Sequence, residues 1–77
     1  MVHKLVAEIP KENIDNEIEY LVIESDDNDT KGFFLFMHKS LDEPCEADLW
    51  FADIEGAKRQ AKFNYGIEFD EWQTLEI

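Results

Sequence analysis

Apolar residues along this chain fall into short runs with the two-residue repeat of β-strands, and turn-forming residues separate the runs. Residues 2–9 alternate loosely and end at Pro10. Residues 18–23 and 33–38 are rich in β-branched and aromatic side chains, which suit a pleated surface. A shorter run follows at 47–51. The pattern predicts four strands, of which the second and third form a hairpin.

The connections between these strands carry signals of their own. The second and third strands are joined by residues 25–32, an acidic turn in which Asp and Asn bond their own backbone and Gly32 supplies positive φ. Residues 11–16 are polar and are expected to form a loop or a short turn. Residues 41–46 contain Pro44, which interrupts the sheet before the fourth strand.

One helix is predicted at residues 54–65. Asp53 is a suitable N-cap, because its carboxylate can accept from the first free N–H groups. Gly66 suits the position just beyond the last turn, where a left-handed backbone is common. Residues 69–77 then either add a final strand or pack on the core. At 100° per residue, four helical residues share one buried face: Ile54, Ala57, Ala61 and Tyr65.

These elements predict a single acidic α+β domain at residues 1–77. The sheet is expected to be small and antiparallel, with four or five strands and one C-terminal helix (β-β-β-β-α, with or without a final strand). A chain of 77 residues suffices for one domain. Its core depends on large side chains, since 13% of the residues are aromatic.

The charge balance is the most unusual property of the sequence. Nineteen acidic and seven basic residues give a formal net charge of −12. This excess argues against direct binding to nucleic acid or to an anionic membrane surface, and it favours a protein partner with a basic surface. Disorder, which a high net charge also favours, is excluded because the apolar residues are frequent and clustered.

Compartment signals indicate the cytoplasm. Cys45 is the only cysteine, so no disulfide can form within the chain, which suits a reducing environment. The N-terminal residues lack the apolar run of a secretory signal. No stretch approaches the roughly eighteen consecutive apolar residues of a membrane-spanning helix. A cytoplasmic protein is therefore expected.

The last third of the chain resembles a group of short bacterial proteins. The shared features are a strand ending in Trp, an acid-capped helix with A-K-x-x-A spacing, a Tyr-Gly-Ile turn and a late Trp. Most of these positions serve capping and packing, so the resemblance implies a fold, and the group has no assigned activity to carry over. The corresponding residues here are Trp50, Asp53, Ala57-Lys58, Ala61, Tyr65-Gly66-Ile67 and Trp72.

The acidic turn matches a calcium loop only in part. Asp27, Asp29 and Gly32 fit the first, third and sixth positions of an EF-hand loop. Lys31 stands where a ligand is needed, and His38 stands where a bidentate Glu is needed. Because two strands flank the loop instead of two helices, a solvated turn is the better interpretation.

No other cluster in the sequence indicates metal binding or catalysis. His3, His38 and Cys45 are spread singly over the chain, without the close ligand pair typical of zinc sites. Ser25 and Ser40 lack the motif of a nucleophile elbow, and there is no glycine-rich phosphate loop. We therefore expect no catalytic residue, no metal, no cofactor and no enzymatic activity.

The two central strands are apolar on both faces, although one helix covers only one face of a sheet. Three outcomes remain open for the second face. The sheet closes on itself, the C-terminal segment covers the face with Trp72 and Leu75, or the face binds another molecule. Alternation divides the third strand into two sets, Phe33, Leu35 and Met37 against Phe34, Phe36 and His38.

The candidate partner-binding residues follow from this excess of apolar surface. One of the two sets is expected to lie under the helix and the other to form a contact patch, bordered by acidic side chains that steer a basic partner. The candidates on this patch and its border are Phe34, Phe36, Glu19, Glu24 and Asp48.

Two further candidates lie on the helix. Phe63 falls opposite Ile54 on the helical wheel and beside Arg59, and aromatic and Arg side chains are enriched at interface hot spots. The alternative for Phe63 is packing beneath Phe69 or Trp72.

The sequence best fits a non-enzymatic protein-binding module whose partner is a protein with a basic surface or a second copy of the chain. A sharper version is an acidic inhibitor or immunity-type protein that neutralises a basic partner. The alternative is a mimic of nucleic acid that occupies a DNA-binding protein. A mimic needs carboxylates in phosphate-like rows, whereas the acids of this chain lie mostly in turns.

Overall fold

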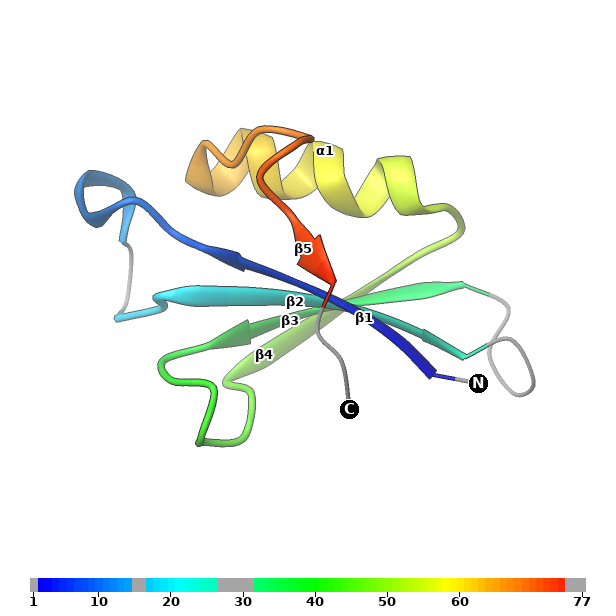
Figure 1. The fold of residues 1–77 in the computed structure, drawn as a ribbon, viewed down its shortest axis with the longest axis horizontal. Helices are drawn as coiled ribbons and strands as arrows, with labels where there is room; N and C mark the ends of the chain where they lie inside the picture. Colours follow the sequence, from blue (N-terminus) through cyan, green and yellow to red (C-terminus); the bar gives the residue numbers. More distant parts are fainter. Residues whose placement is uncertain (1, 15–16, 27–31, 75–77) are drawn as a thin grey trace.

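The computed structural model describes residues 2–14, 17–26 and 32–74, which form a five-stranded antiparallel sheet with one helix on one face (Figure 1). The strand order across the sheet is β4-β3-β2-β1-β5. The predicted α+β class is confirmed, and the final strand is present. In chain order the elements are β1 (Val2–Glu8), the 3-10 helix η1 (Lys11–Asn13), β2 (Tyr20–Asp26), β3 (Phe33–His38), β4 (Ala47–Phe51), α1 (Ile54–Tyr65) and β5 (Gln73–Thr74).

The predicted bounds hold for β3, β4 and α1 but not for β2. The second strand begins at Tyr20 rather than at residue 18, and it runs on to Asp26. Glu17 has a φ of 67°, a left-handed conformation that turns the chain just before Ile18, and Ile18 makes an isolated β-bridge. The antiparallel pairing of β2 with β3 confirms the hairpin. Residues 27–31, which include most of the positions compared with a calcium loop, lie outside the described residues.

Both ends of α1 are capped as the sequence predicts. Oδ1 of Asp53 accepts a hydrogen bond from the N–H of Gly56 at 2.7 Å, which satisfies one of the free donors of the first turn. Gly66 has a φ of 73° and a ψ of 21°, the left-handed conformation that glycine adopts at little cost. Its N–H donates to the carbonyl of Lys62 at 2.9 Å. These caps fix the length of the helix that covers the sheet.

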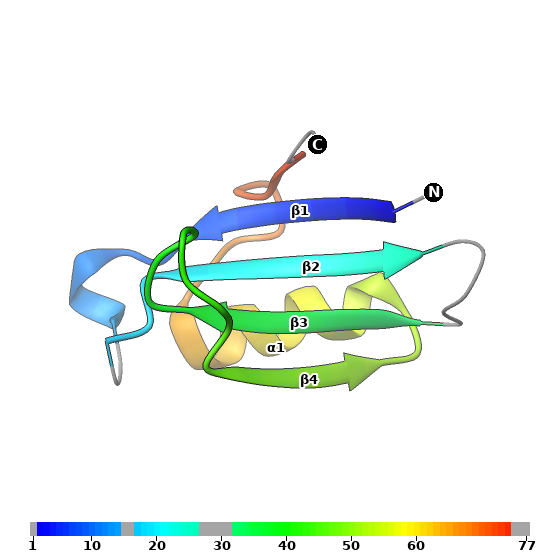
Figure 2. The same ribbon diagram turned by 90° about the horizontal axis from the view of Figure 1, so that it is seen from below.

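The core lies between α1 and the sheet. The helix crosses one face on its way from β4 at one edge to β5 at the other (Figures 1 and 2). Ala57 and Ala61 are 0% exposed, and their small side chains let the helix backbone approach the strands closely. The largest fully buried side chains are Leu21, Ile23, Leu35 and Ile67.

The described part of the C-terminal segment, up to residue 74, extends the sheet instead of covering its second face. β5 pairs with β1 through Leu5 and Val6. Trp72, just before β5, is partly buried against the core on the helix side. Coverage of the second face by Trp72, one of the expected outcomes, is therefore wrong, and Leu75 lies outside the described residues.

Candidate protein-interaction surface

The sheet face turned away from α1, which we call the open face, is seen in Figure 2 with the helix behind the strands. Successive strand residues point to opposite faces. Because Leu35 is buried under the helix, its neighbours Phe34 and Phe36 belong to the open face. The cross-strand register extends this assignment to the other strands. The open face then comprises Lys4, Val6, Glu8, Tyr20, Val22, Glu24, Phe34, Phe36, His38, Asp48, Trp50 and Gln73.

Aromatic side chains form a row along β3 on this face. The rings of Phe34 and Phe36 stack with their centroids 5.8 Å apart and an interplanar angle of 16°. The ring of His38 meets Phe36 edge-on at 6.5 Å. Trp50, opposite Phe34 in the register, is 53% exposed, and a Cβ built on Gly32 would lie 2.6 Å from its Cε2 atom. The indole therefore packs closely against Gly32 and extends the aromatic row to the edge of the sheet.

The connection between β3 and β4 covers part of the open face. In Figure 2 it passes in front of β2 and reaches toward the end of β1. Leu41 of this connection remains 45% exposed, so the cover is partial. Between the loop and the strands lies a pocket of about 450 Å³, lined by Lys4, Val22, Glu24, Phe36, His38, Leu41 and Cys45.

Polar contacts hold this loop in place. Nδ1 of His38 lies 3.1 Å from the carbonyl oxygen of Glu43. Nζ of Lys39 forms ion pairs with Glu17 at 3.1 Å and with Glu46 at 3.4 Å. The side-chain hydrogen bonds to Glu17 and Glu46 raise the pKa of Lys39. The loop is thus a defined border of the open face.

Carboxylates lie among the apolar side chains of the open face. Glu24 pairs with Lys4 at an Nζ–Oε2 distance of 3.9 Å. Asp48 lies next to Phe36 in the cross-strand register and is exposed. Within the described residues, no cation lies within ion-pair distance of Asp48. The carboxylate of Asp48 is therefore available to pair with an added cation.

Glu19, the third predicted border residue, lies apart from this face. It precedes β2, where its N–H donates to the carbonyl of His38 at 2.9 Å and its carbonyl accepts from Ile9 at 2.8 Å. Its side chain borders a shallow depression that Lys11 and Lys39 also line, at the end of the sheet. The structure thus unites Phe34, Phe36, Glu24 and Asp48 and separates Glu19 from them.

The two helix candidates belong to a different surface. Phe63 is 86% exposed, so its predicted alternative, packing beneath Phe69 or Trp72, is wrong. Phe63 and Arg59 line a shallow groove of about 450 Å³ with Phe51 and Gly56. Phe51 belongs to β4 and shares the helix-side face with Leu35. We call this the edge groove, because it lies between α1 and the outer strand of the sheet.

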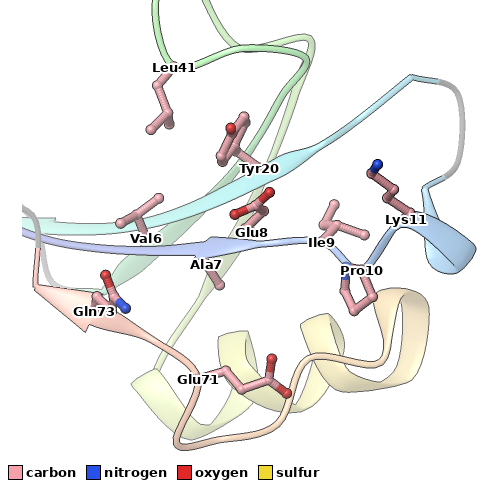
Figure 3. A pocket seen from close by; sticks show the side chains of 10 residues that line it. All are labelled: Val6, Ala7, Glu8, Ile9, Pro10, Lys11, Tyr20, Leu41, Glu71 and Gln73. Atoms are coloured by element: carbon pink, nitrogen blue, oxygen red, sulfur yellow. The ribbon is translucent and has the colours of Figure 1, made fainter.

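A further hollow of about 510 Å³ lies along β1, between the Val6–Gln73 pair and Lys11 (Figure 3). Glu8 and Tyr20 border it on the open-face side of β1, whereas Glu71 approaches from the side of α1. Among the described residues, no group of three or more His, Cys, Asp or Glu side chains is placed to hold a metal.

Two exposed apolar residues at or over the open face, Trp50 and Leu41, were not among the predicted binding residues. Trp50 was not predicted to bind a partner. It lies two residues after Asp48 in the same strand, so the alternation of strand side chains places both on one face, and this signal was present in the sequence. Leu41 lies in a loop without periodicity, so no pattern in the sequence indicated that it folds back over the sheet.

Comparisons with protein-family models, with curated proteins and with solved structures found no match for this chain. In the described part of the chain, no helix is long and apolar enough to cross a bilayer. The surfaces described above are therefore the basis for a functional proposal.

Proposed function

We propose that this chain is a non-enzymatic protein-binding module that holds a partner with a basic surface against the open face of its sheet. The observation that carries the proposal is the exposed end of the aromatic row beside the unpaired carboxylate of Asp48. Trp50 is 53% exposed, and Phe34 and Phe36 are only partly buried. Exposed aromatic side chains with a charged border are typical of interface hot spots.

The net charge of −12 selects the kind of partner. Lys4 is the one lysine or arginine that the described strands place on the open face, and it already faces Glu24. A basic partner gains from this field during encounter and can pair with Asp48 once it is bound. An inhibitor or immunity-type protein that neutralises a basic partner is the sharper form of this proposal.

Two alternative hypotheses, a homodimer and a nucleic-acid mimic, fit the charges of the chain less well. Two copies meeting through their open faces would each bring a net charge of −12, and the repulsion opposes a homodimer. A nucleic-acid mimic would present carboxylates in an unbroken row, whereas Glu24 and Asp48 are separated by aromatic side chains on this face. A basic protein surface fits this alternation of apolar and acidic groups better.

Affinity capture with matched variants tests the proposal. Wild-type protein and the variants Phe36→Ser and Asp48→Lys are immobilised and exposed to native lysate, and captured proteins are identified by mass spectrometry. The controls are Phe69→Ser and Glu12→Lys, which change an exposed aromatic residue and an exposed acid away from the open face. We expect a basic protein to be captured by the wild type and both controls and to be lost with the two open-face variants.

The captured protein is then purified and titrated against the wild type at increasing salt. Affinity should fall with ionic strength, because the charges at the rim of an interface are screened. Equal capture by all five proteins, provided that circular dichroism shows each to be folded, would contradict the proposal.

A further inference from the structure

The outer edge of β4 is an unprotected strand edge. In the part of the chain that the structure describes, β4 pairs with β3 alone. Residues 47–50 are exposed, and the strand contains no proline and a single charged residue, Asp48. Natural sheets usually protect such edges with prolines, several charges or a covering segment. The backbone groups along this edge are thus available to pair with an added strand.

The two sides of this edge differ in chemistry. Asp48 and Trp50 point to the open face, whereas Leu49 and Phe51 point to the helix side. Leu49 is 42% exposed. Phe51 borders the edge groove, in which Phe63 is 86% exposed. An added strand would therefore meet a carboxylate and an indole on one side and apolar surface on the other.

We propose that this edge pairs with an extended segment of the partner in which basic and apolar residues alternate, so that the five-stranded sheet gains one strand. The inference rests on the proposed function and names the element of the partner that is bound. Side chains of an added strand point alternately to the two faces. Basic side chains reach Asp48 and lie over the ring of Trp50, where the aromatic face attracts cations. Apolar side chains enter the edge groove.

The charge of the chain favours a basic segment of a partner at this edge over a second copy of the chain. A second copy would bring its own net charge of −12 to an edge that already carries Asp48. Arg59 borders the edge groove and disfavours basic side chains on the helix side. The bound segment therefore has one preferred orientation, in which its basic side chains point toward the open face and its apolar side chains point toward α1.

The probe is an acetylated and amidated eight-residue peptide of alternating valine and lysine, titrated into the isotope-labelled full chain while backbone amide signals are recorded. Two N-methylated isomers provide the decisive comparison. One carries methyl groups on the valine nitrogens and the other on the lysine nitrogens. Because the N–H groups of alternate residues point to opposite edges of a strand, one isomer loses its donors toward β4 and the other only its donors toward solvent. We expect one isomer to bind and the other to be inactive.

Matched variants complete the test. Leu49→Lys should lower the affinity for the peptide by about tenfold, because the substitution removes an apolar contact and its positive charge repels the basic peptide. Phe69→Lys changes a residue of similar exposure, 43% against 42%, in the connection between α1 and β5, and should leave the affinity unchanged. Equal binding of both N-methylated isomers, or signals that move at Phe36 but not along β4, would overturn the edge inference.

The failure of this inference differs from the failure of the proposed function. If Phe36→Ser abolishes capture and the peptide shifts no signals along β4, the open face is a binding surface and the edge inference is wrong. Peptide binding along β4, together with capture that does not depend on Phe36 and Asp48, overturns the open-face proposal and retains the edge.

Discussion

The two faces of the sheet are built from the same strands and have different surroundings. On the helix side, Leu21, Ile23 and Leu35 are at most 2% exposed. On the open face, Val22 is 5% exposed, whereas its neighbours Tyr20 and Phe36 are only partly buried. Both faces carry large apolar side chains, so apolar content alone does not decide which face becomes the core. The position of the helix decides it.

The open face also differs in having a charged border. Glu24 and Asp48 lie among its apolar side chains, whereas the buried side chains of the described residues include no charged or polar residue. A face that is covered within the chain tolerates few charges, because a buried charge without a partner is costly. The acids therefore mark the face that stays in contact with water or with another protein.

The sharpest way to test this comparison is to truncate adjacent residues of β3 that point in opposite directions. Leu35→Ala should lower the free energy of unfolding by about 3 kcal/mol, because it leaves a cavity under α1. Phe36→Ala should cost about 1 kcal/mol, since its side chain is only partly buried. Urea unfolding of both variants measures the difference. Equal losses would show that the open face is a second core.

The caps of α1 stabilise the helix that covers one face of the sheet. Gly66→Ala should cost about 2 kcal/mol, because an alanine at a φ of 73° is strained and its Cβ would lie 2.6 Å from Nδ2 of Asn13. That nitrogen donates to the carbonyl of Tyr65 at 2.9 Å, so the clash also disturbs a hydrogen bond that holds the end of the helix.

Asp53→Ala provides the comparison at the other helix end. It should cost about 1 kcal/mol through the loss of the N-cap bond to Gly56. Thermal unfolding followed by circular dichroism gives both values. A stability for either variant within a few tenths of a kcal/mol of the wild type would contradict the role given to that cap.

A smaller effect is expected on the open face at Gly32. Gly32→Ala should cost about 0.5 kcal/mol, because the exposed indole of Trp50 can rotate away from the new methyl group. Tryptophan fluorescence of the folded protein should change, whereas Phe69→Ala serves as a control that leaves the indole in place. An unchanged spectrum would mean that Trp50 does not rest on Gly32 in solution.

The smallest expected effect concerns both faces together. Added salt should raise the melting temperature by about 3 °C, because a net charge of −12 repels itself and salt screens that repulsion. Exposed ion pairs, such as Lys62–Glu68 at 3.1 Å, oppose this trend only weakly. A melting temperature that falls with salt would show that such pairs outweigh the repulsion.

Local signals in the sequence predicted the helix and most of the strands, whereas the choice of buried face and the pairing of β1 with β5 depend on residues far apart in the chain. Asp53 and Gly66 predicted both ends of the helix because capping depends on neighbours in the chain. The period of two showed that Phe34 and Leu35 lie on opposite faces, but it cannot tell which of them lies under the helix. The pairing of β1 with β5 joins residues near the two ends of the chain through two pairs, and no local pattern encodes it.

The candidate site was predictable to the same extent. The register places Asp48 and Glu24 on one face with Phe36, which the sequence analysis had grouped correctly. Glu19 was misplaced because it directly precedes Tyr20, so the alternation of strand side chains puts it on the face opposite to Glu24 and Phe36, a signal that the sequence already carried. Trp50 and Leu41 depend on how β4 and its preceding loop lie against the sheet, which requires three-dimensional contacts.

The unequal edges of the sheet also limit how far association can proceed. Continuous growth of a fibre by head-to-tail strand pairing would require β4 of one molecule to join β1 of the next. The short β5 occupies the outer side of β1 at Leu5 and Val6, and Pro10 follows the strand without an N–H to donate. In the described part of the chain one edge is open and the other is obstructed, so head-to-tail pairing of successive copies is disfavoured, and strand pairing at β4 does not by itself propagate into a fibre.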